Sequence, residues 1–376
     1  MALNGNSSAT STPYCDWRNR SATAIGCNDA FSFWKLPDNW RSALARSIPQ
    51  SATVAERFLF QKYLEDDREP CRTQREARQR FRNLIPGLMQ RRGRTRAAHL
   101  SLRRDFPSWP CESALLDYWR QWLRGALTAL HLKDGWHIGF WPAGAQCSIA
   151  LMHDIESREG FTRIEGIAKL EEKYGFRSAW NLVLAQNQVD WSAVNALKGR
   201  GFEFGTFSRK RTGQPACGDR GASAYEFDFD SSFADTDPHQ AHPGGTCSVF
   251  PFFLPDLVEL PYTLEQDRTF VRILRRSPLP IWMLKARWVS AVGGMILVRT
   301  DPSCIGTENY LPVYERLLDN LNRIDRAWRA LPSEAAAWWR RRDALTLEVI
   351  GKQPIIAGSD ITGAVAQRLL HEPLFQ

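Results

Sequence analysis

Two acidic residues, Asp154 and Glu156, follow the apolar run Ala150-Leu151-Met152 and are the strongest candidates for chemistry in this chain. In a β-strand, residues two apart point to the same face. A strand that ends in these acids can therefore present both carboxylates to one ligand. They could bind a metal together, or one could bind the metal while the other acts as a general base. The simpler interpretation is that they only cap the helix that follows.

The elements around this pair alternate between short strands and helices from His137 onward. We expect strands at 147–152, 178–184 and 202–206, and helices at 163–174 and 191–198. Strand–helix–strand units of this length indicate a parallel sheet, so the expected fold class is α/β, either a barrel or a doubly wound sheet. Ligands of such folds bind at the carboxyl ends of the strands, where Asp154 and Glu156 lie.

The remaining elements suggest four regions. Helices are expected at 54–65, 112–132, 310–330 and 333–341, the last with Ser333 as its N-cap, and strands at 224–229, 257–260 and 295–300. Residues after 343 read as strands followed by a last helix. We therefore expect a loose lead, a helical and basic N-terminal region, an α/β domain and a small tail, at residues 1–30, 31–135, 136–342 and 343–376.

Several motifs, in a consistent order along the chain, resemble the polysaccharide deacetylase (NodB-homology) family. The first is His153-Asp154-Ile155-Glu156, which is similar to a branch of the family whose motif reads H-D-[VI]-[DE]. The other similar segments lie between residues 100 and 342, at 106–110, 140–142, 173–178, 201–205, 229–233, 235–238, 258–263, 293–295, 300–302 and 328–339.

This resemblance implies a distorted (β/α) barrel that removes acetyl groups from an N-acetylated sugar or polysaccharide with a divalent metal, usually zinc. Asp154 would be the base that deprotonates the metal-bound water, and Glu156 would bind the metal. In the family, two histidines spaced H-x3-H complete the metal site, and a late histidine protonates the leaving amine. The metal is needed because it lowers the pKa of water and polarises the acetyl carbonyl.

The chain departs from the family pattern at three positions. Phe207 and Arg211 stand where the two histidine ligands are expected, and neither can donate a lone pair to zinc. Asp301 stands near the position of the late histidine and could act as the acid only with a strongly raised pKa. The segment 206–222 is also short, from deletion, frameshift or natural divergence. We therefore expect an incomplete site, in an impaired hydrolase or in a non-catalytic carbohydrate-binding relative.

Other residues offer weaker alternatives. His239 and His242 form an H-x2-H pair that could bind zinc, although exposed loop histidines are the simpler interpretation. His153 points away from the face of Asp154 and is expected to pack or to support the site. The tryptophans at 141, 180 and 282 could stack on sugar rings, with core packing as the alternative.

The charge and cysteine content suggest where the protein acts. The formal net charge is +8, and arginines gather between 72 and 104. This stretch could bind nucleic acid or an anionic membrane surface, but no recognition motif accompanies it, so we expect no specific nucleic acid and a solvated face. The eight cysteines form no CxxC pair, and neither a secretory leader nor a run of roughly 18 apolar residues is visible. A cytoplasmic protein with reduced thiols is expected.

Overall fold

The computed structural model describes most of the chain from Asp134 onward and two shorter stretches before it. The described residues are 30–44, 114–132, 134–183, 189–206, 229–231, 233–235, 246, 248–253 and 257–370. The helix expected at 54–65, the basic stretch 72–104 and most of the strand expected at 224–229 lie outside them.

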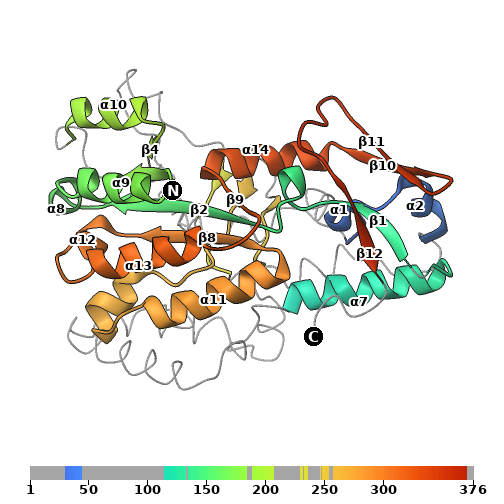
Figure 1. Ribbon diagram of the computed structural model, residues 1–376, viewed down its shortest axis with the longest axis horizontal. Coiled ribbons are helices and arrows are strands. Elements are labelled where there is room, and N and C mark those ends of the chain that lie inside the picture. The colour runs from blue at the N-terminus through green and yellow to red at the C-terminus, as the bar shows by residue number, and fades with distance from the viewer. Residues whose placement is uncertain are drawn as a thin grey trace, which may run out of the picture.

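A five-stranded parallel sheet runs through the middle of the protein (Figure 1). Its strand order is β4 (Glu203–Thr206), β3 (Ser178–Leu182), β2 (Cys147–Ile155) and β8 (Met295–Thr300), and β9 (Ala327–Arg329) pairs with the start of β2. All nine residues of β2 are buried, as expected for a central strand covered on both faces. The expected α/β class is therefore confirmed, and β8 spans the expected residues.

Helices connect and cover these strands. Their amphipathic spacing explains how they pack: α9 buries Ile164, Ile167, Ala168 and Glu171, three or four residues apart and hence on one face. Gly175 follows α9 with φ of 73°, a conformation that favours glycine, so the expected stop is confirmed. The helices are α8 (Arg158–Phe161), α9 (Ile164–Lys173), α10 (Trp191–Gly199), α11 (Leu279–Val292), α12 (Pro302–Ile305), α13 (Leu311–Asn322) and α14 (Pro332–Asp343).

Two helix predictions are wrong about a boundary, the first about where α13 ends and the second about the N-cap of α14. The helix expected at 310–330 stops at Asn322, because the following residues extend and pair with β2 as β9. Tertiary pairing here overrides local helix propensity. The N-cap of α14 is Leu331 rather than Ser333. The hydroxyl of Ser333 instead donates to Glu203 on β4.

A second, small sheet lies on the side of the main sheet where β8 is the last strand. It has the order β5 (Phe229–Asp230), β7 (Val258–Glu259) and β6 (Phe252–Phe253). The chain after β7 bonds to β8: the backbone N–H of Thr263 donates to the Leu297 carbonyl at 3.1 Å. These links bring the two sheets together at β8, but a closed ring of strands, as in the expected barrel, is not seen among the described residues.

The beginning and the end of the described chain pack together at one end of the molecule (Figure 1). There β1 (Asp134–Ile138) pairs antiparallel with β12 (Ala366–Leu370), beside the hairpin of β10 (Thr346–Ile350) and β11 (Gln353–Ala357). The helices at this end are α1 (Ala30–Trp34), α2 (Asp38–Leu44) and α7 (Ala114–Ala129). The expected strand-rich tail is confirmed, while the last helix expected with it is absent from the described residues up to 370.

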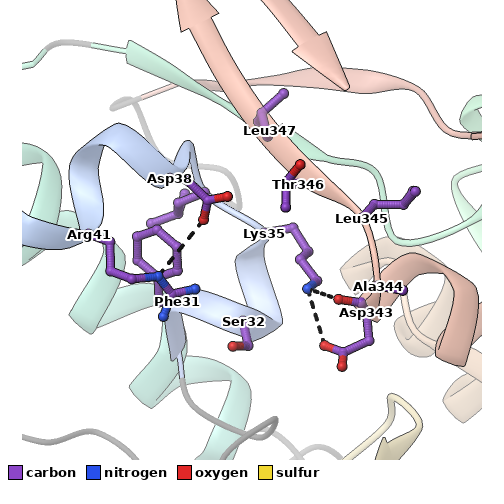
Figure 2. A pocket seen from close by; sticks show the side chains of 11 residues that line it. Phe31, Ser32, Lys35, Asp38, Arg41, Asp343, Ala344, Leu345, Thr346 and Leu347 are labelled. Carbon is purple, nitrogen blue, oxygen red and sulfur yellow. Dashed lines mark hydrogen bonds and ion pairs between the residues drawn. The ribbon is translucent and has the colours of Figure 1, made fainter. Parts of the chain in front are cut away.

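A cavity of about 380 Å³ lies between α1, α2 and β10 (Figure 2). The Lys35 ammonium closes one side by binding both the carboxylate and the backbone carbonyl of Asp343. On the other side Arg41 lies 4.1 Å from the centre of the Phe31 ring and 3.8 Å from the Asp38 carboxylate. The Lys35–Asp343 pair joins the segment after α1 to the end of α14, whereas the Arg41–Asp38 pair lies within α2.

Arg342 of α14 holds this junction together from the inside. Its buried guanidinium donates 2.9 Å hydrogen bonds to the backbone carbonyls of Gly139, Ile138 and Phe33. It also lies 5.0 Å from the centre of the Phe140 ring. Burial lowers the pKa of Arg342 to about 9, a shift only partly offset by Asp343. The carbonyls belong to two segments far apart in the chain, Ile138-Gly139 at the end of β1 and Phe33 of α1, so one side chain ties α14, β1 and α1 together.

Replacing Arg342 with lysine should lower the free energy of unfolding by about 1–3 kcal/mol, because a single ammonium cannot reach three carbonyls from the position of a planar guanidinium. Urea denaturation would measure the change. The matched control is Arg316→Lys at an exposed position of α13, which should leave the midpoint unchanged. Equal midpoints for the two variants would contradict this role of Arg342.

Candidate functional site

Asp154 lies on β2 at the carboxyl end of the main sheet, and both of its carboxylate oxygens are bound. The register places Asn181 of β3 opposite Asp154, and the Asn181 amide donates to Oδ1 at 2.8 Å. On the other side, the Arg299 guanidinium of β8 donates to Oδ2 at 2.8 Å. Arg299 pairs in register with Met152, so strand alternation places it on the same face as Asp154. The carboxylate is held rigidly between two strands.

Arg299 is a buried cation that follows the apolar residues 295–298 of β8. Besides Asp154, its guanidinium donates to the Ser231 carbonyl at 2.6 Å and lies 5.5 Å from the centre of the Tyr262 ring. Burial acts to lower the pKa of Arg299, but the carboxylates of Asp154 and Asp230 and the phenol of Tyr262 more than offset it, so the net shift is upward. Arg299 therefore stays charged and neutralises Asp154.

Glu156 follows the end of β2 and forms an ion pair with Arg268. The Arg268 guanidinium donates to Oε2 of Glu156 at 2.6 Å, and each side chain is 39% exposed. On its other side Nε of Arg268 lies 3.6 Å from Asp301. Glu156 and Asp301 thus lie on the two sides of Arg268, while Asp154 is bound to a different arginine, Arg299.

Asp301 is engaged as a helix cap and in ion pairs rather than left free as an acid. One of its oxygens accepts the Ser303 N–H at 2.8 Å at the start of α12, and the other lies 3.3 Å from Arg272. The buried Asp267 carboxylate accepts the Asp301 N–H at 3.1 Å. Burial raises the pKa of Asp267 well above its usual range, helped by the nearby Asp301 charge. Asp267, which the sequence did not single out, is thus a buried carboxyl with a raised pKa beside Asp301.

The opposite face of the sheet holds a buried polar network around His153. The two ring nitrogens of His153 lie 2.7 Å from the Thr300 hydroxyl and from Glu171 of α9. Glu171 also accepts hydrogen bonds of 2.6 Å from the hydroxyls of Tyr314 on α13 and Ser178 on β3. All five side chains are buried, so His153 supports the sheet and does not face the site, as its position next to Asp154 indicated.

The described residues do not fit a zinc ion. They contain no group of three or more histidine, cysteine, aspartate or glutamate side chains placed to hold a metal. Glu156, the expected ligand, is already bound by the Arg268 guanidinium, and a cation at that point would repel a dication. Phe207, Arg211, His239 and His242 lie outside the described residues.

The tryptophans considered for sugar stacking belong to the core. Trp141, Trp180 and Trp282 each have no exposed surface, so a sugar ring cannot reach them. Sequence reasoning missed the arginines that hold the acids, Arg268 and Arg299. The available signal was an arginine inside the apolar strand 295–300, which a buried partner of opposite charge would explain.

Comparisons with known proteins give limited matches. No protein-family model matches the sequence, and no curated protein matches it significantly. Among solved structures, the allantoinase PuuE covers 53% of this chain and 92% of its own, at 12% identity and a TM-score of 0.38. A putative polysaccharide deacetylase from Mycobacterium smegmatis has the same coverages, 13% identity and a TM-score of 0.37. A probable polysaccharide deacetylase from Pseudomonas aeruginosa PAO1 covers 52% of this chain and 92% of its own, at 14% identity and a TM-score of 0.39.

Proposed function

We propose that this chain is a polysaccharide deacetylase-like protein that binds an N-acetylated carbohydrate at the carboxyl ends of β2 and β8 without hydrolysing it. The observation that carries this proposal is the ion pair between Glu156 and Arg268. In a zinc-dependent deacetylase the carboxylate at this position would be free to bind the metal. Here it is neutralised by a side chain of the protein itself.

The carbohydrate in this proposal comes from the sequence resemblance. Two of the segments similar to the deacetylase family, 153–156 and 300–302, lie at the carboxyl ends of β2 and β8. In parallel α/β folds, ligands bind at this edge of the sheet. The exposed parts of Glu156, Arg268 and Arg272 offer charged and polar groups there, which can hydrogen-bond to sugar hydroxyls and to an acetamido carbonyl.

The absence of turnover follows from the chemistry of amide hydrolysis. Without a metal, the pKa of water stays far above neutral, and both oxygens of the Asp154 carboxylate already accept hydrogen bonds from Arg299 and Asn181. The expected acid, Asp301, is bound to two arginines and caps α12. A sugar held at these residues would therefore leave unchanged.

Elemental analysis of the purified chain should find substoichiometric zinc, even after incubation with zinc and dialysis. An acetate-release assay with N-acetylglucosamine oligomers should give no signal above buffer, while calorimetry should show binding of the same oligomers. Asp154→Asn should keep this binding, because the amide retains most of the shape of the carboxylate. Calorimetry with the unrelated neutral polymer dextran provides the control for nonspecific sugar binding.

A hydrolase would give a different pattern in these assays. Stoichiometric zinc that is lost in Glu156→Gln, together with acetate release that is lost in Asp154→Asn, would replace the binding proposal with a metal-dependent deacetylase. No binding of any N-acetylated oligomer would contradict both.

A further inference from the structure

Two arginines lie four residues apart at the rim of the candidate site. Arg268 precedes the π-helix η8 (Thr269–Leu274) and Arg272 lies within it. The Arg268 side chain is 39% exposed and that of Arg272 is 51% exposed. Both guanidiniums contact the same atom, Oδ2 of Asp301, at 3.6 and 3.3 Å. The two cations are therefore adjacent and both reach solvent.

Each guanidinium keeps a nitrogen that no described residue binds. Arg268 uses Nη1 for Glu156 and Nε for Asp301. Arg272 uses Nε for the Cys304 sulfur at 3.1 Å and Nη2 for the Ser303 hydroxyl at 2.6 Å. Burial raises the pKa of the Cys304 thiol to about 11, so this partner is neutral, and Asp301 is the anion that pairs with Arg272. Nη2 of Arg268 and Nη1 of Arg272 remain as donors at an exposed edge.

The protein holds these donors in place before any ligand binds. Asp301 is only 3% exposed and is fixed as the cap of α12, with the Asp267 carboxylate behind it. Arginines anchored in this way lose little side-chain freedom when they bind a ligand, which favours affinity. A pair of guanidinium groups matches the two oxygens of a carboxylate in geometry and in charge.

We propose that Arg268 and Arg272 bind the carboxylate of a uronic acid residue, so that the carbohydrate recognised at this site is acidic. This inference rests on the proposed function and names the class of sugar that the site selects. The ligand carboxylate would bridge the two arginines and compete with Glu156 for Arg268. A neutral sugar would have no group with the charge to make this exchange.

Calorimetry with two matched ligands would test the inference. The first is an oligosaccharide that alternates N-acetylglucosamine and glucuronic acid, and the second is the same oligosaccharide with its carboxyl groups reduced to alcohols. We expect the native protein to bind the acidic form at least about tenfold more tightly, as expected for a charge-assisted hydrogen-bond pair. Arg268→Ala and Arg272→Ala should each remove most of this preference. The control Arg276→Ala, at an exposed position on the same segment, should keep it.

Glu156→Gln provides a second test, in which the preference for the acidic oligosaccharide should increase. Removing the competing carboxylate frees Arg268, so the ratio of the affinity for the acidic oligosaccharide to that for the reduced form should rise several-fold. The preference should also weaken with added salt, because it depends on charge. Thermal unfolding of each variant checks that it is folded, and Arg268→Lys and Arg272→Lys serve where an alanine variant does not fold.

The outcomes separate this inference from the proposed function. Equal binding of the acidic and reduced oligosaccharides overturns the carboxylate assignment and leaves the proposed function standing. A sulfated oligosaccharide without carboxyl groups that binds as tightly as the uronic acid form also overturns it. Binding of neither ligand contradicts the proposed function itself. Acetate release together with the arginine-dependent preference contradicts only the absence of hydrolysis.

Discussion

Replacing Glu171 with alanine should lower the free energy of unfolding by about 3–5 kcal/mol, because it leaves a buried histidine and two buried hydroxyls without their common partner. Glu171 accepts from His153, Tyr314 and Ser178, which lie on β2, α13 and β3. Burial and the Glu171 charge raise the pKa of Tyr314 well above its usual range, so the phenol remains a donor. One carboxylate therefore joins the sheet to two helices.

Chemical denaturation followed by tryptophan fluorescence would measure this loss. Glu171→Gln should recover part of it, because the amide oxygen can still accept from His153 and Tyr314. The matched control is Glu165→Gln on the exposed side of the same helix, where the pairs with Arg200 and Lys169 contribute roughly 0–1 kcal/mol. A Glu171→Ala variant as stable as this control would show that the network contributes no stability.

Stability should fall by an amount on the order of 3–5 kcal/mol as the pH drops from 6.5 towards 3, because of His137. His137 is buried on β1 beside the rings of Trp34 and Phe140, and Nδ1 has no hydrogen-bond partner among the described residues. Burial, together with the nearby Arg342 charge, lowers the pKa of His137 from 6.5 to about 3. In the unfolded chain the pKa returns towards 6.5.

Between these two pH values the unfolded chain binds a proton that the folded protein does not. Acid therefore stabilises the unfolded state, and the contribution of His137 is fully present above pH 6.5 and lost as the pH falls towards 3. Urea denaturation at pH 7.0 and pH 4.5 would measure the effect. His137→Phe, which cannot titrate, should show a smaller decrease over this range than the native protein. Parallel decreases in the two proteins would rule out this role of His137.

The local pattern of the sequence predicted the elements whose burial is periodic. β2 and β8 are apolar runs in which nearly every side chain is buried, and α9 buries residues three and four apart. Such segments specify their own secondary structure because the period of the apolar residues matches one geometry only. The prediction failed for Ala327–Arg329, whose strand exists only because β2 lies beside it.

In the candidate site, too, the local sequence predicted some features and the tertiary structure decided the others. The sequence by itself identified Asp154 and Glu156 as acids at a strand end, since this requires only the apolar run before them. Their partners come from positions 27 to 145 residues away: Asn181, Arg268 and Arg299. Only the parallel register and the chain after β7 bring these groups within hydrogen-bond distance, and no local pattern encodes such contacts. The tertiary structure thus decided that two arginines, Arg299 and Arg268, pair with the two acids.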